Sequence, residues 1–338
     1  MNRSRRRFLE TAGVAVSAPL LARSAPRAAA QPTAPPARRA AGETPRGMTL
    51  VTIRRRGETS LGIRTDRGIL DVRLAEGMFR QNAPVTIDEV FERGGGAELQ
   101  RLAERAGKED GLHVPEATAE FGPCVTRPEK VVCVGLNYRK HAAETGQPVP
   151  KQPILFNKYN NALNSHRGVI HVSQVPARQF DYEVELVIVM GRRARDVAEA
   201  DALSHVFGYC AGNDFTARDL QRVSSQWMLG KTLDGSAPIG PYLVTADQVP
   251  DPNKLKLECR VNGQVRQSSN TADMVFNCAS LVSYISRHFT LVPGDLIFTG
   301  TPEGVIAGYP RERQVWLEPG DQVTSTIERL GDLQFTLA

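Results

Sequence analysis

The sequence predicts a β-rich α+β fold, with a mixed β-roll catalytic domain preceded by a small N-terminal β domain. Short β-branched runs recur along the chain, and turn sequences such as Asn262-Gly263 and Pro293-Gly294-Asp295 separate them. Windows with helical spacing are few. With 338 residues, 41% of them hydrophobic and 23% charged, the chain can bury a large core and has an ordinary globular composition.

Residues 1–30 are predicted to be a targeting segment. The run Ser4-Arg5-Arg6-Arg7-Phe8-Leu9-Glu10 resembles the twin-arginine export motif, an apolar stretch follows over residues 11–22, and residues 28–30 suit a cleavage site. A basic disordered arm is the alternative. The apolar stretch is shorter than the roughly 20 residues that span a bilayer, so no membrane span is expected. We expect a periplasmic or secreted protein whose mature chain begins near Gln31.

Residues 31–47 are predicted to be a Pro/Ala-rich linker without core-forming residues. The formal net charge of +5 comes mostly from the segment before this linker. That segment contains Arg3, Arg5, Arg6, Arg7, Arg23 and Arg27 against a single acid, Glu10. Since the rest of the chain is close to neutral, nothing indicates nucleic-acid binding.

Residues 48–120 are predicted to form the small β domain. Residues 48–54, 60–64 and 69–74 have the pattern of short strands in a meander. Thr86 and Glu89 have capping-box spacing at the start of a helix, which Gly94-Gly95-Gly96 interrupts and which resumes to Ala106. This domain contains no catalytic constellation.

Two carboxylates stand in the apolar run of residues 180–191. Glu183 and Glu185 are two residues apart, so on a strand their side chains point to the same face. Burying two like charges is costly unless a cation compensates them, and the run contains no Lys or Arg. A second apolar run ends at Asp214, and three carboxylates with open positions suit Mg²⁺ or Mn²⁺. A solvated strand edge and an ordinary helix cap at Asp214 are the alternatives.

His141 and Glu144 follow a predicted strand at residues 130–134. Their i, i+3 spacing puts them on one face of a helical turn. An acid that orients one ring nitrogen while the other contacts water is what general-base catalysis needs. A helix cap or a surface histidine is the alternative.

Residues 128–338 resemble the fumarylacetoacetate hydrolase family. The matching motifs occur in order at residues 132–141, 180–185, 213–221, 226–231, 293–295 and 299–305. The resemblance implies the β-roll fold and a small N-terminal β domain. It implies a metal site at Glu183, Glu185 and Asp214, a water-activating dyad of His141 and Glu144, and substrate contact by Lys231. Gly230 departs from the family, which often has alanine or a larger residue there, and residues 160–168 lie where the family varies.

Three more residues are candidate substrate ligands. Arg218 and Gln221 follow Asp214 on one helical turn, and Thr301 could bind a carboxylate through its hydroxyl. Arg218 could instead only pair with Asp219 or a glutamate, and Thr301 could only form a turn.

The expected function is divalent-metal-dependent hydrolysis of a carbon–carbon bond in a 2,4-dioxo acid of the acylpyruvate kind. Decarboxylation, tautomerisation or isomerisation of an oxo-dicarboxylic acid on the same site is the alternative, and an exported non-catalytic binding protein is another. We expect a small-molecule oxo acid as the ligand and a homodimer as the assembly. The five cysteines lack Cys-x-x-Cys spacing, so we expect free thiols rather than a zinc site.

Overall fold

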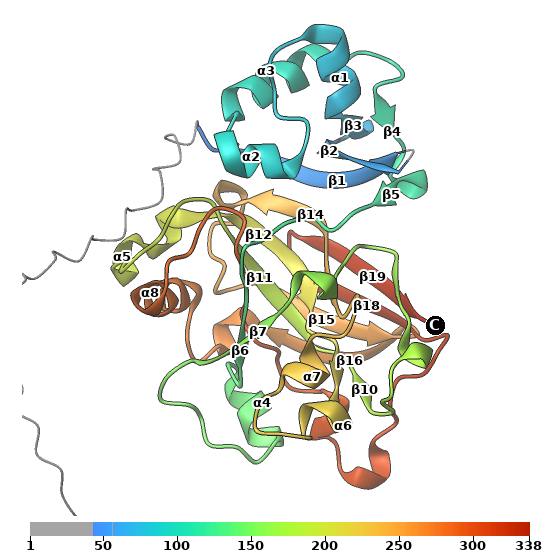
Figure 1. Cartoon of the computed structure of the whole chain (residues 1–338), viewed down its shortest axis with the longest axis vertical. Helices are drawn as coiled ribbons and strands as arrows, with labels where there is room; N and C mark the ends of the chain where they lie inside the picture. Colours follow the sequence, from blue (N-terminus) through green and yellow to red (C-terminus); the bar gives the residue numbers. More distant parts are fainter. Residues whose placement is uncertain (1–42, 56) are drawn as a thin grey trace, which may run out of the picture. The chain divides into compact units, whose positions relative to one another are not determined.

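The computed structural model describes residues 43–55 and 57–338, which belong to one compact unit (Figure 1). The predicted targeting segment at residues 1–30 and most of the predicted linker lie outside the described residues. The predicted boundary between a small β domain and a catalytic domain stays a prediction. Within the described ranges, none of the helices combines the length and the apolarity needed to cross a membrane.

The N-terminal part begins as an antiparallel meander. Its strands are β1 (Thr49–Arg55), β2 (Glu58–Thr65), β3 (Gly68–Asp71), β4 (His113–Val114) and β5 (Glu120–Phe121). Its helices are α1 (Val72–Phe79), α2 (Ile87–Arg93) and α3 (Gly96–Ala106). Half of the predicted capping box is present, because the Glu89 N–H donates to Thr86 Oγ1 at 3.2 Å. The Glu89 carboxylate accepts the N–H of Val85 at 3.2 Å, one residue before the N-cap Thr86, where a full box would use the N–H of Thr86.

One predicted strand ends earlier than expected. Residues 69–74 were predicted as a strand, but β3 stops at Asp71 and α1 begins at Val72. The Asp71 carboxylate accepts hydrogen bonds from the backbone N–H groups of Arg73 and Leu74 at 3.1 and 3.2 Å. This cap starts a helix within a run whose apolar residues suit a strand equally well.

The main sheet joins the N-terminal meander to the rest of the chain. Among the described residues it has 12 strands, and β1 pairs with β14 (Ala237–Thr245). Beyond β14 the order continues through β12 (Val206–Asn213), β11 (Val184–Met190), β17 (Leu296–Phe298), β6 (Val131–Gly135) and β7 (Ile154–Lys158). The short β8 (Leu163–Asn164) also pairs with β14. β17 and β6 run parallel, and the other pairs named from β14 to β7 along this order are antiparallel.

A second sheet covers one face of the first. In the described part of the chain it has five strands, in the order β16 (Gln264–Asn270), β15 (Lys256–Val261), β18 (Gln322–Ile327), β19 (Gly331–Leu337) and β9 (Gly168–Ile170). The predicted hairpin at Asn262-Gly263 joins β15 to β16, with φ of 50° and 80° at the two turn residues. The mixed, β-rich α+β fold is confirmed.

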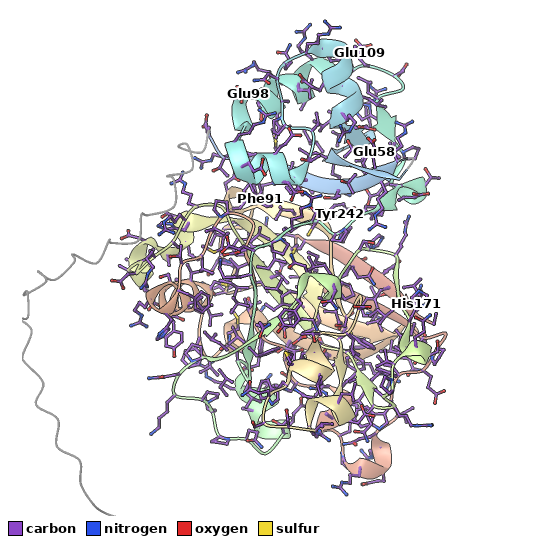
Figure 2. The ribbon with its side chains drawn as sticks, viewed as in Figure 1. Glu58, Phe91, Glu98, Glu109, His171 and Tyr242 are labelled. Atoms are coloured by element: carbon purple, nitrogen blue, oxygen red, sulfur yellow. The ribbon has the colours of Figure 1, made fainter. Side chains whose placement is uncertain are left out.

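The core lies on both faces of β11. Leu186 and Ile188 pack into a cluster shared with the second sheet, while Val187 and Val189 pack into a cluster under the N-terminal helices. In that second cluster, Phe91 of α2, labelled in Figure 2, belongs to an aromatic pair. Its ring meets that of Phe207 of β12 edge to face, with ring centroids 5.2 Å apart. All five cysteines are buried and free, as predicted. Since β11 is buried on both sides, its carboxylate Glu185 is held inside the protein.

The remaining helices and strands are short except for one. α8 (Cys278–His288) packs against α5 (Glu199–Ala202). The others are α4 (Arg139–Glu144), α6 (Arg218–Gln221), α7 (Met228–Lys231), β10 (Phe180–Asp181) and β13 (Thr216–Ala217). α4, α6 and α7 carry most of the predicted site residues outside the sheet.

Candidate active site

The run of residues 180–191 forms two strands rather than one. β10 pairs with β13, and β11 begins at Val184, so Glu183 stands just before β11. The Asp214 N–H donates to the Glu183 carbonyl at 2.9 Å, and the Glu183 N–H donates to Asn213 Oδ1 at 3.1 Å. These bonds hold the start of β11 beside the end of β12, which brings Glu183 next to Asp214.

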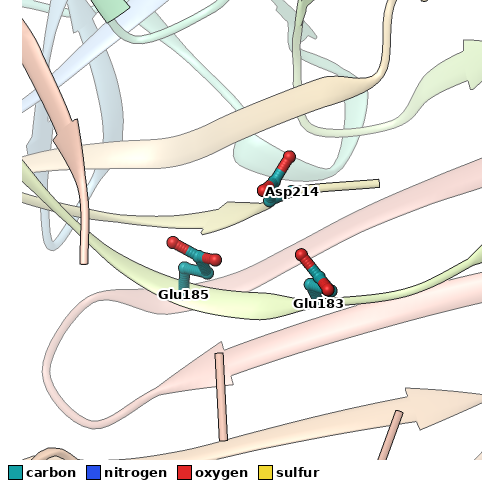
Figure 3. Close-up of side chains that lie close together, drawn as sticks. All are labelled: Glu183, Glu185 and Asp214. Carbon is teal, nitrogen blue, oxygen red and sulfur yellow. The ribbon is translucent and has the colours of Figure 1, made fainter. Parts of the chain in front are cut away.

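Glu183, Glu185 and Asp214 converge as the sequence predicted (Figure 3). One carboxylate oxygen from each lies within 4.8 Å of the others, and all three residues are buried. This donor set of carboxylate oxygens could hold a hard divalent metal ion.

Three buried cations from other elements neutralise most of this charge. Lys231 Nζ lies 2.6 Å from Glu183 Oε2 and 2.6 Å from Asp214 Oδ2. Arg218 Nη2 lies 2.6 Å from Glu183 Oε1, and Lys158 Nζ lies 2.8 Å from Asp214 Oδ1. Lys158 was not predicted, because a lysine that ends an apolar strand is usually solvated. The Lys231 ammonium bridges two of the three carboxylates and supplies them with positive charge.

The carboxylates differ in how their charge is compensated. Burial alone would raise the pKa of Glu183, but Arg218 and Lys231 lower it below its usual range. Burial beside Asp214 and Glu183 raises the pKa of Glu185 well above its usual range. Glu185 accepts a hydrogen bond from the Gly300 N–H at 2.7 Å, and no described Lys or Arg forms a salt bridge with it. Glu185 therefore has no ion-pair partner among the described residues, and a divalent cation would supply one.

His141 and Glu144 meet on α4. His141 Nδ1 lies 2.7 Å from Glu144 Oε1, and the Gly304 N–H donates to Glu144 Oε2 at 2.8 Å. A carboxylate only accepts, so Nδ1 carries the proton and Nε2 is left as the basic nitrogen. This is the arrangement that the i, i+3 spacing predicted.

One cavity of about 720 Å³ collects every predicted site residue. These are His141, Glu144, Glu183, Glu185, Asp214, Arg218, Gln221, Lys231 and Thr301. Its other lining residues include Arg222, Trp227 and Tyr309, which were not predicted. Trp227 meets Phe156 edge to face at 5.3 Å, so the cavity has an apolar wall beside its charged floor.

Arg218 pairs with acids, which is one of the two roles left open from sequence. Its Nε lies 2.8 Å from Asp181 Oδ2, in addition to the contact with Glu183, and Asp219 is not among its partners. Gln221 Oε1 accepts a hydrogen bond from Arg218 Nη1 at 3.2 Å. The guanidinium is therefore largely occupied by protein groups.

Thr301 and Gly230 are fixed by their surroundings. Thr301 Oγ1 accepts a hydrogen bond from Gln267 Nε2 at 2.8 Å, so its own hydroxyl proton can point into the cavity. A β-carbon at Gly230 would lie 2.5 Å from the backbone nitrogen of Gln221. Glycine at this position lets α7 lie directly on α6, which brings Lys231 and Arg218 together.

Residues 130–338 match the family model described as fumarylacetoacetate (FAA) hydrolase C-terminal. The chain belongs to the fumarylacetoacetate hydrolase family. It is 43% identical over 266 residues to the oxaloacetate tautomerase FAHD2A, mitochondrial, of Bos taurus, covering 78% of this chain and 82% of the relative.

Solved structures of fumarylacetoacetate hydrolase family members share the fold. A fumarylacetoacetate hydrolase from Exiguobacterium antarcticum is 31% identical, with a TM-score of 0.68 over 86% of this chain and 99% of that one. A maleylpyruvate hydrolase from Sphingobium sp. SYK-6, in complex with manganese(II) and pyruvate, is 28% identical, with a TM-score of 0.69 and the same coverage. The family's members include tautomerases and hydrolases, so the family assignment establishes an enzyme scaffold without choosing between these reactions.

The expectation of twin-arginine export to the periplasm is wrong. The tautomerases that this chain resembles, from cattle and human, are mitochondrial proteins, which points away from an exported bacterial-type address. An Arg-rich segment with few acids is also the composition of organelle transit peptides, so composition alone does not identify the route. The segment concerned lies outside the described residues.

Proposed function

We propose that the chain is a divalent-metal-dependent tautomerase of a 2-oxo dicarboxylic acid of the oxaloacetate class. The observation that carries the proposal is a general-base pair, His141 and Glu144, lining the same cavity as a carboxylate triad. The 43% identity to an oxaloacetate tautomerase supports the reaction.

Glu183, Glu185 and Asp214 would hold Mg²⁺ or Mn²⁺. Two observations support this assignment: the Lys231 ammonium already lies between the carboxylates of Glu183 and Asp214, and Glu185 has no ion-pair partner among the described residues. The manganese in the maleylpyruvate hydrolase structure supports the same class of ion. A divalent ion bound there supplies the Lewis acidity that draws electrons from the 2-oxo group and acidifies the C3 protons.

His141 would move the proton. Its Nε2 takes a proton from C3 of the keto form while Glu144 holds Nδ1 and stabilises the imidazolium that forms. Lys231, which holds Glu183 and Asp214, would add positive charge to the site in which negative charge develops on the 2-oxo oxygen, and Thr301 would donate to the adjacent carboxylate. The His141 imidazolium then gives that proton to the 2-oxo oxygen, which yields the enol and regenerates the base, so the reaction needs no co-reactant and breaks no carbon–carbon bond.

Hydrolysis of a 2,4-dioxo acid, the first expectation from sequence, is the second candidate. It is favoured by the likeness to a maleylpyruvate hydrolase, and the same dyad could deprotonate a water molecule instead of C3. We put tautomerisation first because the identity to a tautomerase is higher, over 78% of the chain, and supports that reaction.

The test is to incubate the Mg²⁺-loaded protein with oxaloacetate and, separately, with acylpyruvates. If the protein is a tautomerase, it should speed up keto–enol conversion of oxaloacetate and exchange of its C3 protons in D₂O relative to the uncatalysed rates, and it should not cleave the substrate into two fragments. His141→Ala should lower kcat by roughly 10² to 10⁴ while leaving Mg²⁺ affinity nearly unchanged. Cleavage of an acylpyruvate with ¹⁸O from water in the released acid, and no effect on oxaloacetate, would establish the hydrolase instead.

A further inference from the structure

One cation of the cavity has no partner among the described residues. Lys231 is occupied by Glu183 and Asp214, and Arg218 by Asp181, Glu183 and Gln221. Arg222 lines the same cavity with an exposed side chain, and it forms no side-chain hydrogen bond or salt bridge within residues 43–55 and 57–338. Its guanidinium is therefore available to a ligand.

Arg222 is placed one helical turn beyond the buried end of the site. It caps α6 four residues after Arg218, and i, i+4 residues share a helix face with Cβ atoms about 5–6 Å apart. Asp219, which lies between these two arginines in sequence, does not form an ion pair with Arg222. Its carboxylate instead accepts hydrogen bonds from the backbone N–H groups of Arg178 and Leu220. Arg218 thus contacts Glu183 at the floor, while Arg222 stands nearer the open side.

The apolar wall of the cavity offers no charge partner for an anion. The Trp227 ring lies over Gly135, where a β-carbon would be 2.6 Å from the ring, and it also packs against Phe156. A flat apolar wall can border a carbon chain, but it cannot pair with a carboxylate.

The acidic side chains at the bottom of the cavity, here called the floor, can be neutralised without Arg222. The acids on or beside the floor are Asp181, Glu183, Glu185, Asp214 and Glu144. The charges of Lys158, Arg218, Lys231 and one divalent ion would balance them. A substrate carboxylate that reaches Arg222 would meet a positive charge that no protein group has neutralised.

We propose that Arg222 binds the distal carboxylate of the substrate and so selects dicarboxylic 2-oxo acids over acids with an uncharged tail. The inference rests on the proposed function and names the group that sets its substrate class. Arg222 and the carboxylate triad line one cavity, so a diacid whose 2-oxo end lies at the triad can present its distal carboxylate to the Arg222 side of that cavity. Arginine suits this role because its planar fork can hold a carboxylate through two N–H groups.

The experiment compares oxaloacetate with its 4-methyl ester, which has lost only the distal charge. With the Mg²⁺-loaded enzyme, Arg222→Gln should raise KM for oxaloacetate about tenfold, leave kcat nearly unchanged, and remove the preference for the diacid over the ester. Arg222→Lys should recover part of that preference. Arg192→Gln is the matched control, because Arg192 is exposed and lies beyond the end of β11 opposite to Glu185.

A binding measurement separates this inference from the proposed reaction. The analogue 3,3-difluoro-oxaloacetate has no C3 proton and cannot tautomerise, so its calorimetric Kd reports recognition alone. Arg222→Gln should weaken its binding about tenfold, and Arg192→Gln should not. If wild type does not tautomerise oxaloacetate but binds the analogue through Arg222, the proposed function fails and this inference holds. Equal losses for diacid and ester, or an unchanged Kd for the analogue, would overturn it.

Discussion

Gly308 faces the Glu144 carboxylate so closely that a β-carbon at residue 308 would lie 2.6 Å from Glu144 Cδ. The same carboxylate accepts the Gly304 N–H and holds His141 Nδ1. The loop that carries residues 304–310 and the dyad on α4 therefore form one packed unit. Gly304 and Gly308, which are far from the carboxylate triad in sequence, therefore hold Glu144 in the position from which it orients His141.

Gly308→Ala should lower kcat without weakening metal binding. The added methyl group would push Glu144 aside, and a misplacement of about 1 Å in a catalytic group can cost roughly 10²-fold. Steady-state kinetics and Mg²⁺ titration measure the two effects. Gly77→Ala is the control, because nothing lies within 4 Å of a β-carbon there and alanine should stabilise α1 by about 0.5–1 kcal/mol. Wild-type kcat in Gly308→Ala would show that Glu144 does not orient the base.

Glu185→Gln should act in opposite directions on metal-free and metal-loaded protein. The pKa of Glu185 is raised in the folded state above its unfolded value of about 4.3. At a pH between these two pKa values the folded protein binds more protons than the unfolded chain. The free energy of unfolding therefore falls as pH rises toward and through the folded-state pKa. The glutamine removes this penalty and should raise the melting temperature in EDTA at neutral pH. It should also weaken Mg²⁺ binding and abolish the proton release that accompanies it.

Calorimetry in two buffers of different ionisation enthalpy measures that proton release. A fall in melting temperature for Glu185→Gln in EDTA would contradict the raised pKa. Unchanged Mg²⁺ affinity would instead remove Glu185 from the ligand set.

Local spacing predicted the parts of the site that lie on one element. The two-residue spacing predicted that Glu183 lies beside Glu185, although Glu183 stands just before β11 rather than on it, and the i, i+3 rule placed His141 with Glu144. The Asn262-Gly263 hairpin follows from turn chemistry that involves only neighbouring residues.

Pairings between distant elements could not be predicted in this way. Lys158 reaches Asp214 because β7 and β12 are placed by a sheet order that spacing does not encode. The availability of Arg222 could not be predicted from the local sequence either. Only the fold shows that Arg218 is paired with protein groups, whereas Arg222 has no side-chain partner among the described residues. The start of α1 was missed because Asp71 suits a strand end and a helix cap equally.

Lys158→Met should destabilise the metal-free protein by about 3 kcal/mol, because it removes one partner of a buried ion pair and leaves Asp214 less compensated. Chemical unfolding in EDTA measures the loss. The double variant Lys158→Met/Asp214→Asn should lose less than the sum of the single changes, since no unpaired charge remains. Lys256→Met, at an exposed position of β15, is the control for removing a lysine. Strict additivity in the double variant would mean that the two side chains do not depend on one another.

His166 should make the protein less stable as the solution becomes more acidic. Burial, together with the neighbouring Arg167, lowers the pKa of His166 to about 4, and its Nδ1 accepts the Gln334 N–H at 3.2 Å, which only the neutral ring can do. The unfolded chain protonates near pH 6.5, so between about pH 6.5 and 4 the unfolded state binds the extra proton and stability falls as pH falls. His166→Gln should flatten this part of the stability curve, whereas His171→Gln, at an exposed residue, should leave it unchanged (Figure 2). Denaturant unfolding at pH 7, 6 and 5 measures the slope, and an identical slope in His166→Gln would assign the acid sensitivity to other groups.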